Sequence, residues 1–331
     1  MKRIVAIALG AIVWCGGCAP RSAAPLLPAA PARIAGVTAV LHLYVTDRGG
    51  AILRYAVDPV TGVPQGTPDA TIAGLHDARG IAIGPNGDVY AVDAAQRSVA
   101  IFAPAPGSAS KPERSLSIGH RRGIGAVAVD ADGYAYVAWS AVCTTEGFVC
   151  GYADVYSPLA KGLKKIATLS FGGGPGGGVV RSIAATGAQT IAVQLGSQSP
   201  EIYSAARSNP SAYMLFCGAE NPSGLAWGAA HTIYETDLGG TQPVTPAQVV
   251  VVPNYLHGNI NNCPAFRTTY PAGFALHNPK AIAARNGVLY VTSAARIFVL
   301  RASSTGAQKA LAVIGGAASQ LHDPRGIAIG P

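Results

Sequence analysis

The stretch Leu321-His-Asp-Pro-Arg-Gly-Ile-Ala-Ile-Gly-Pro331, at the end of the chain, nearly repeats Leu75-His-Asp-Ala-Arg-Gly-Ile-Ala-Ile-Gly-Pro85 in its interior. The interior copy opens a unit of short β-branched or alternating runs that Gly, Pro, Asn and Asp residues separate. This pattern is typical of four consecutive β-strands. A segment that opens a unit inside the chain and also closes the chain predicts a circular array of such units, which is a closed β-propeller.

Six units can be aligned at the end of their second strand. The aligned residues are Asp47, Asp93, Trp139, Gln194, Asp237 and Ser293. The first unit begins at its second strand, residues 41–47, and residues 326–330 supply its missing innermost strand. Pairing the two ends within one blade removes an exposed sheet edge. Because no segment shows sustained helical periodicity, we expect an all-β fold: a six-bladed β-propeller, complete within the chain and closed by its C-terminal strand.

The units share further features with a known family. Leu-x-x-Pro-x-Gly-Ile-Ala is followed by Asp-Gly or Asn-Gly before Val-Tyr-x-x-Asp, and then by an aliphatic strand that ends in Phe-x-Pro. This pattern resembles the NHL-type repeat of six-bladed propellers, and residues 101–119 are similar to blades of bacterial lipoproteins of this kind. The resemblance covers residues 41–331. It implies the fold but not the function, because one propeller scaffold hosts binding modules, lyases and lactonases.

The N-terminus has the order of a secretory signal. Lys2 and Arg3 precede a short apolar run, residues 4–14, and Cys15-Gly-Gly-Cys18 follows it. The run is too short to span a bilayer as a mature helix. The glycines before Cys18 resemble a bacterial lipobox, in which Cys18 would be lipidated and carry a palmitate. Cys15 stands where that motif usually has Leu, so cleavage at an ordinary signal-peptidase site remains the alternative.

The next segment is suited to a tether. Residues 19–38 are rich in Ala and Pro and almost without periodicity, which favours an extended, semi-rigid spacer. We therefore divide the chain into a lipoprotein-type signal peptide over residues 1–18, a tether over residues 19–38 and the propeller over residues 39–331. This layout predicts a lipid-anchored protein of the cell envelope, periplasmic or surface-facing. Ala19, directly after Cys18, indicates the outer membrane.

The charge of the chain narrows the function classes. The formal net charge is +8, and only 12% of the residues are charged. Basic residues form no block and do not interleave with aromatic residues, so we expect no nucleic-acid partner. The sequence also has no Gly-x-Ser-x-Gly, His-Glu-x-x-His or Walker motif, so serine-hydrolase, zincin and P-loop functions lack their usual signatures.

Four cysteines remain after the predicted signal peptide and its lipidated residue. An even number of cysteines in an exported chain favours disulfides. Cys143 and Cys150 flank a short hairpin tip and are expected to pair, and Cys217 then pairs with Cys263 by elimination. Metal or redox chemistry is the less favoured alternative, because no Cys-x-x-Cys spacing occurs among the four.

Three histidines occupy the same repeat position, in the loop that enters an innermost strand: His76, His277 and His322. Units 6, 1 and 2 are neighbours in the closed ring, so we expect these imidazoles in one sector of one face. Three imidazoles that converge on a channel would suit Zn²⁺ with one open position, an arrangement that activates water. The interpretation that we prefer is that each histidine caps its own turn or lies at the rim.

A basic residue follows each histidine at a fixed spacing: Arg79, Lys280 and Arg325. An arc of such residues would recognise an anionic ligand, such as an acidic sugar, a carboxylate or a phosphate. The alternative, which a recurring pattern favours, is that the bases pair with Asp47, Asp93 and the Asp or Asn beside each histidine. Such pairs would join adjacent loops, and they are compatible with binding at the same residues.

Two further residues belong to the candidate loop face. Asp237 ends the second strand of unit 5, and Trp139 replaces the aspartate in unit 3. An aromatic residue there suits a surface that binds a sugar or a peptide. A tryptophan at a strand end is, however, more often a packing residue.

The leading hypothesis is an exported, lipid-anchored propeller that binds a ligand or a protein partner through its loop face and catalyses no reaction. We expect a monomer without a cofactor, attached to the membrane by its lipid, whose partner is an envelope protein or a small anionic ligand. The competing hypothesis is a metal-dependent lyase or hydrolase that holds Zn²⁺ with His76, His277 and His322.

Overall fold

The computed structural model describes the propeller with several gaps. The described residues are 40–119, 123–143, 147–159, 162–171, 178–187, 189–196, 200–204, 206–207, 211–215, 221–240, 245–253 and 266–331. The predicted signal peptide with Cys18 and the predicted tether lie outside them, as do Cys217 and Cys263. The predictions for these segments are therefore not tested by the structure.

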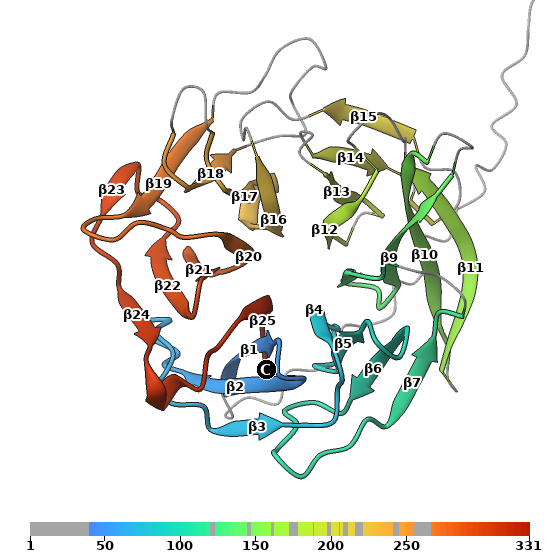
Figure 1. The fold of residues 1–331 in the computed structure, drawn as a ribbon, viewed down its shortest axis with the longest axis horizontal. Helices are drawn as coiled ribbons and strands as arrows, with labels where there is room; N and C mark the ends of the chain where they lie inside the picture. The colour runs from blue at the N-terminus through green and yellow to red at the C-terminus, as the bar shows by residue number, and fades with distance from the viewer. Residues whose placement is uncertain are drawn as a thin grey trace, which may run out of the picture. The chain divides into compact units, whose positions relative to one another are not determined.

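Six β-sheets surround a central axis as the blades of a ring (Figure 1). This confirms the predicted all-β, six-bladed propeller. Within each blade the strands run from the axis outward. Blade 1 consists of β25 (Pro324–Gly330), β1 (Leu41–Asp47), β2 (Ala51–Val57) and β3 (Ala70–Ile72). Blade 2 consists of β4 (Ala78–Ile83), β5 (Val89–Asp93), β6 (Ser98–Phe102) and β7 (Arg114–Ser117). Blade 3 consists of β8 (Ala126–Val129), β9 (Ala135–Val142), β10 (Val149–Leu159) and β11 (Gly162–Phe171).

The remaining blades follow the same order, with one addition in blade 5. Blade 4 consists of β12 (Val180–Ala185), β13 (Ile191–Leu195), β14 (Glu201–Ser204) and β15 (Ser211–Leu215). Blade 5 consists of β16 (Pro222–Trp227), β17 (Ile233–Asp237), β18 (Gln248–Val252), β19 (Arg267–Pro271) and the added β23 (Gly306–Gln308). Blade 6 consists of β20 (Pro279–Arg285), β21 (Val288–Ser293), β22 (Arg296–Arg301) and β24 (Ala312–Gly315). Outside the sheets, the described residues include two 3₁₀ turns, η1 (Ala229–His231) and η3 (Ala317–Ser319).

The C-terminal strand closes the ring. β25 pairs antiparallel with β1, from Gly330 opposite His42 to Pro324 opposite Asp47. The Tyr44 hydroxyl donates a hydrogen bond to the carbonyl oxygen of Pro331 at 3.1 Å. Each innermost strand also contacts the innermost strands of both neighbouring blades. As the sequence predicts, β25 therefore supplies the innermost strand of blade 1, and this strand contacts the innermost strands of blades 2 and 6.

The hydrophobic core lies between the blades rather than at the axis. Every residue of β5 is buried, and its alternate side chains face opposite neighbours. Val89 and Ala91 pack with residues of blade 1, whereas Tyr90 and Val92 pack with residues of blade 3. Because neighbouring blades cover both faces, side chains that point to either face are apolar. This is why such strands are nearly continuous apolar runs in the sequence.

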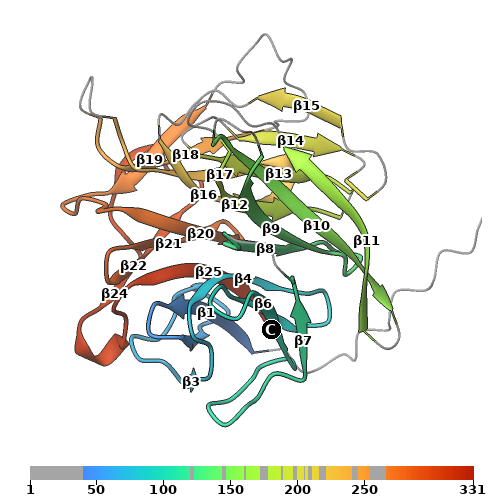
Figure 2. The same ribbon diagram turned by 45° about the vertical axis from the view of Figure 1, so that its right-hand side comes forward.

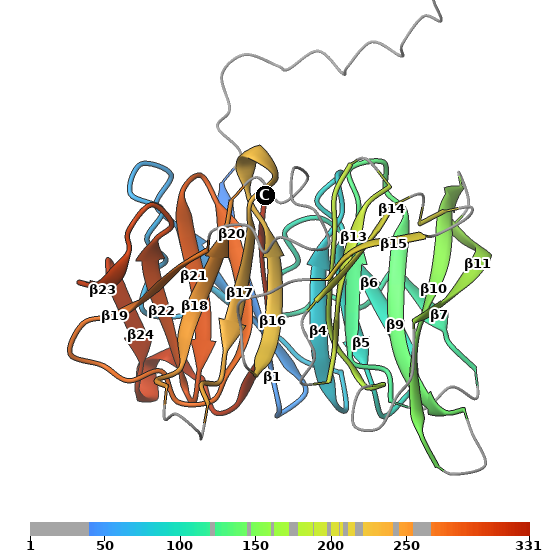
Figure 3. The same ribbon diagram turned by 90° about the horizontal axis from the view of Figure 1, so that it is seen from above.

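A disulfide joins Cys143 and Cys150, the two residues that the sequence pairs at a hairpin tip. It ties together the ends of β9 and β10, whose hairpin extends beyond the neighbouring blades at the lower right of Figure 3. Among the described residues, no helix is long and apolar enough to cross a membrane.

Candidate functional site

A β-bulge recurs near the start of the innermost strands. In blade 1, Asp47 pairs with Pro324 and Thr46 with Gly326, so Arg325 has no partner in the ladder. A single residue is skipped in the same way at Arg181, Ser223 and Lys280, and in blade 2 the interruption covers Arg79 and Gly80. A bulge leaves one residue out of the ladder and redirects its side chain.

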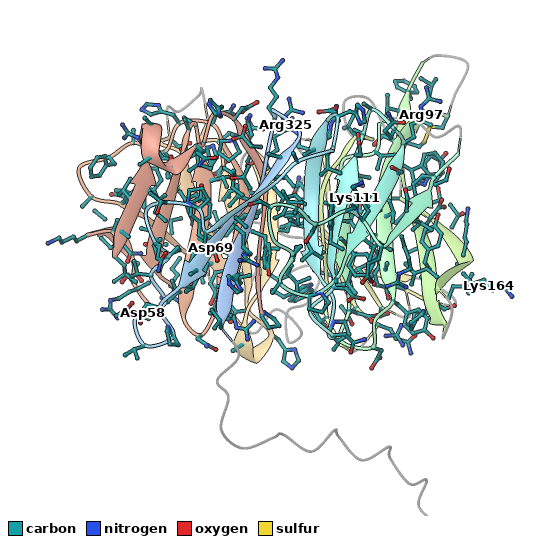
Figure 4. All side chains as sticks on the ribbon, turned by 90° about the horizontal axis from the view of Figure 1, so that it is seen from below. Asp58, Asp69, Arg97, Lys111, Lys164 and Arg325 are labelled. Carbon is teal, nitrogen blue, oxygen red and sulfur yellow. A yellow bond between two sulfur atoms is a disulfide. The ribbon has the colours of Figure 1, made fainter. Side chains whose placement is uncertain are left out.

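The bulge residues meet at one end of the central channel. A cavity of about 380 Å³ is lined by all five of them and by Gly125, which holds the matching position in blade 3. We call this cavity the channel mouth. Each blade thus contributes the residue at this one equivalent position, and four of these six residues are Arg or Lys. Arg325 projects from this end of the propeller in Figure 4, whereas Asp58 and Lys164 lie toward the opposite end.

The channel is narrow below the mouth. The space between the innermost strands measures about 70 Å³, and its lining residues include Ile81, Val127 and Leu225 as well as Arg181, Lys280 and Arg325 of the mouth. A ligand larger than a few atoms would therefore remain at the mouth, in contact with the basic side chains.

Salt bridges link three of the four cations. Lys280 pairs with Asp323, and the Arg325 guanidinium lies between Asp323 (3.5 Å) and Asp77 (2.6 Å). Arg79 pairs with the other oxygen of Asp77 at 2.9 Å. The chain of ion pairs runs continuously through blades 6, 1 and 2. Burial opposes ionisation of Asp323, but the hydrogen bond from Lys280 and the charges of Lys280 and Arg325 hold its pKa below the usual range.

Arg181 differs from the other three cations. Its guanidinium lies 3.4 Å from the Asn221 side-chain oxygen and 3.4 Å from the Pro222 carbonyl, and it forms no ion pair with a described residue. Four cations therefore face two carboxylates, Asp77 and Asp323, which leaves two positive charges uncompensated within the described part of the mouth. The uncompensated charge suits an anion.

The histidine loops are held by aspartates of the second strands. Asp93 accepts hydrogen bonds from the amides of His76 (2.9 Å) and Asp77 (3.2 Å), and its Oδ2 lies 3.1 Å from His76 Nδ1. Burial opposes ionisation of Asp93, but these hydrogen bonds lower its pKa. Asp47 accepts from the amides of His322 (2.8 Å) and Asp323 (3.0 Å) in the same way.

In blade 6 a serine performs the same task, since the Ser293 hydroxyl accepts from the amide of His277 at 2.7 Å. The His76 and His322 side chains are 61% and 81% exposed, so they point into solvent rather than into the channel. Within the described residues, no three His, Cys, Asp or Glu side chains are placed to hold a metal ion. The geometry corresponds to histidines in capped turns at the rim.

The predicted pairing of the basic residues is confirmed for the aspartates beside the histidines and is wrong for Asp47 and Asp93. The bases pair with Asp77 and Asp323, the aspartates beside the histidines. Asp47 and Asp93 instead bind backbone amides. Two residues of the mouth escape sequence reasoning, Arg181 and Ser223, because blades 4 and 5 lack the Leu-His-Asp pattern that marks the other loops.

Neither Trp139 nor Asp237 lines the mouth. Trp139 is 8% exposed and stacks on Tyr152, with ring centroids 4.3 Å apart, in the core between blades 2 and 3. Asp237 is 1% exposed and accepts hydrogen bonds from the amides of Asn221 and Gly239, each at 3.0 Å. These contacts make Trp139 a packing residue and Asp237 a turn cap.

Comparisons with known proteins identify the fold and no family. No family model and no curated protein matches the chain. An aldose sugar dehydrogenase from Streptomyces coelicolor, solved in its PQQ-bound form, is similar over 78% of this chain and 86% of its own, at 16% identity and a TM-score of 0.51. A functionally unknown protein from Desulfotomaculum acetoxidans is similar over 86% and 82%, at 14% identity and a TM-score of 0.54. A protein of unknown function from Bacteroides caccae is similar over 88% and 98%, at 12% identity and a TM-score of 0.53. Similarity at these identities shows that the chain shares the β-propeller fold, and it leaves the function to be argued from the site.

Proposed function

We propose that this protein is an exported, lipid-anchored propeller of the NHL-repeat type that binds a small anionic ligand at the channel mouth and catalyses no reaction. The observation that carries the proposal is the convergence of the bulge residues. Four of the six blades direct Arg or Lys into one cavity of about 380 Å³, and among the described residues two carboxylates compensate them. A fixed arc of guanidinium and ammonium groups recognises carboxylate, sulfate or phosphate oxygens.

The salt bridges support binding rather than compete with it. Asp77 and Asp323 hold Arg79, Lys280 and Arg325 in place before a ligand arrives, so little side-chain entropy is lost on binding. Arg181 stands in the opposite half of the ring with no carboxylate partner among the described residues. We infer that the ligand bridges Arg181 and the ion-paired arc.

The lining of the mouth favours a binding role over catalysis. Apart from the four cations, its described polar side chains are Ser223 and Asn278. Neither group titrates near neutral pH, so neither supplies the acid or base that proton transfer requires. The exposed, outward positions of His76 and His322 give no support to a zinc-dependent reaction in the channel.

The anchor and the location remain part of the proposal. The order of charged residues, apolar run and Cys18, followed by the Ala/Pro-rich segment, supports a lipid-anchored protein of the cell envelope, monomeric and sorted to the outer membrane. Metabolic labelling with a palmitate analogue should depend on Cys18. Undiminished labelling of Cys18→Ala would contradict the anchor without touching the proposal for the mouth.

Calorimetric titration of the purified full chain tests the binding site. The ligands are inorganic phosphate, citrate, glucuronate and PQQ, the last because a structural neighbour was solved with it. We expect at least one of them to bind, with at least a tenfold weaker Kd in Arg181→Ala, about 1.4 kcal/mol.

Arg285→Ala is the matched control, since Arg285 is exposed at the far end of the strand that carries Lys280. Its affinity should equal that of the wild type. Failure of all four anions to bind, or equal losses in the two arginine variants, would overturn the proposed site.

A further inference from the structure

One sector of the channel mouth receives no side chain at the position of the bulge residues. In blade 3 this position is Gly125, between Arg79 of blade 2 and Arg181 of blade 4. A Cβ on Gly125 would lie 3.6 Å from the Val180 carbonyl oxygen, which is an ordinary contact, so packing does not require a glycine there. Because the side chain is missing, the cavity extends over Gly125 beside the ion-paired arc.

Val179 makes the far side of this gap apolar. It lines the mouth directly before β12 and is 48% exposed. The preceding residue, Gly178, packs so closely against blade 3 that a Cβ on it would overlap the Val149 carbonyl group. Val149 is the first residue of β10, so Val179 stands beside the disulfide-linked end of the β9–β10 hairpin. Figure 2 shows β9 and β10 side by side, with β12 next to them.

The hairpin adds two further valines on the same side. Alternate residues of β9 face blade 4: Ala138 packs in the core between blades 3 and 4, and the Ser140 hydroxyl accepts a hydrogen bond from the Val180 amide at 2.9 Å. Val142 follows at the same spacing, so its side chain turns to the same face. It is 67% exposed and pairs with Val149 of β10. We call Val142, Val149 and Val179 the valine patch.

The valine patch stands at the rim of the mouth. In the register of β9, Trp139 holds the position of Asp93, whose carboxylate binds the loop that carries His76. β9 continues past that level to Val142. The described residues of the patch and its flanks, 138–143, 147–152 and 178–180, include no charged side chain. The patch therefore continues the lining of the mouth as an apolar surface, with Val179 in both.

The mouth can hold a molecule that has both a charged and an apolar part. Its volume of about 380 Å³ falls in the range of about 300–1,000 Å³ that small-molecule pockets occupy. Among the described residues its lining includes four cations and no carboxylate, so the charged part is an anion. Val179 and Leu238 line the same cavity as Arg181, so an anion bound there has apolar neighbours.

We propose that the ligand of the channel mouth is a small, free amphipathic anion, a carboxylate or phosphate monoester with an aliphatic chain. The inference rests on the proposed function and names the class of ligand that the same site takes. The anionic head binds Arg181 and the ion-paired arc, and the chain crosses Gly125 to contact the valine patch. Each methylene group that this contact buries fully tightens binding by about fourfold, because it is removed from water.

The test is calorimetric titration of the purified full chain with two pairs of anions: methyl and hexyl phosphate, and acetate and heptanoate. Within a pair the anions differ only in the length of the alkyl chain. We expect the longer member of at least one pair to have a Kd at least about tenfold lower, because contact of about two methylene groups with the patch suffices. Val142→Ser combined with Val179→Ser should reduce this ratio to below about threefold. Both residues are exposed, so the double variant should unfold at the wild-type midpoint. Val60→Ser is the matched control and should keep the ratio, since Val60 is 91% exposed in the turn after Asp58, at the opposite end of the propeller (Figure 4).

Arg181→Ala removes part of the anion site and should weaken both members of a pair by the same factor. The inference is overturned if both members bind equally, or if the double valine variant keeps the full ratio. Dependence of binding on Arg181 would then still support the proposed function. Failure of both pairs to bind, or equal binding to Arg181→Ala and the wild type, would overturn the proposed function and the inference together. Displacement of hexyl phosphate by phosphatidylglycerol vesicles would assign the patch to a membrane lipid and overturn the free ligand.

Discussion

Glu235 is a buried carboxyl group in a position where other blades have an aliphatic side chain. It is fully buried at the centre of β17, and neither of its oxygens has a hydrogen-bond partner among the described residues. The register of each second strand against the innermost strand identifies the equivalent residues as Val45, Ala91, Val137, Val193 and Val291. Burial, with the charge of Asp237 as a second cause, raises the pKa of Glu235 well above its usual value.

The raised pKa fixes the direction of a pH effect. The unfolded chain releases this proton near pH 4.3, about the usual value for Glu, whereas the folded protein keeps it to higher pH. Between the two pKa values the folded state binds more protons, so the free energy of unfolding falls as pH rises, by at most about 1.4 kcal/mol per pH unit. Even when protonated, the carboxyl group lacks partners, at a cost of about 1–3 kcal/mol.

Glu235→Val should therefore stabilise the protein. Below the unfolded pKa the gain comes from the unpartnered carboxyl alone, about 1–3 kcal/mol, and at pH 5 the difference in proton binding already adds to it. The gain should widen as the pH is raised to 7 and 8, because the variant lacks the titrating group. Urea unfolding of both proteins at pH 5, 6, 7 and 8 measures the difference.

Val291→Glu places the same group at the equivalent position of blade 6, where the residue is fully buried. It should destabilise the protein and introduce the same fall in stability with rising pH. The reasoning is refuted if Glu235→Val is less stable than the wild type at pH 7, or if the difference between the two proteins does not change from pH 5 to pH 8.

Two further predictions concern the ring. Gly326→Ala places a Cβ 2.4 Å from the Arg79 carbonyl oxygen and 2.7 Å from Thr46 Oγ1, where β25 approaches β4. We expect Gly326→Ala to lower the free energy of unfolding by about 1–3 kcal/mol, measured by thermal unfolding. Gly66→Ala, whose Cβ would meet no atom within 4 Å, is the control and should leave the stability unchanged. Equal unfolding midpoints for the two variants would show that β25 and β4 can separate at no cost. Asp93→Asn weakens the cap on the His76 loop and should lower stability by about 1–3 kcal/mol at pH 7. The fold lowers the pKa of Asp93, so the stability that its carboxylate contributes is present above the pKa of the unfolded chain and is lost as pH falls through the pKa of the folded protein. The difference in stability between wild type and Asp93→Asn should therefore shrink toward pH 3. A difference that stays constant with pH would contradict this account.

The alignment of blade 4 shows where sequence reasoning reached its limit. The sequence pattern places Gln194 at the position of Asp93. In the structure Val193 pairs with Ile183 as Ala91 pairs with Ile81, so Leu195 holds that position instead. Side chains alternate between the two faces of a strand, and a shift of one residue therefore exchanges the faces. The turn between the first two strands has five residues in both blades, so Leu195 follows Arg181 at the same distance as Asp93 follows Arg79. An alignment anchored on the innermost strand, rather than on the polar residue at the strand end, agrees with the backbone pairing.

The sequence by itself determined the fold class, the number of blades and the closure by residues 326–330, because a repeat that recurs along the chain specifies one supersecondary unit per copy. It also located Arg79, Lys280 and Arg325 on one face. Only the tertiary structure decided that Arg181 and Ser223 join them, since the bulges that redirect these side chains follow from strand pairing. Ring closure likewise brings Arg325 to Asp77, 248 residues away in the chain, so the charge balance of the mouth depends on contacts that no local pattern encodes.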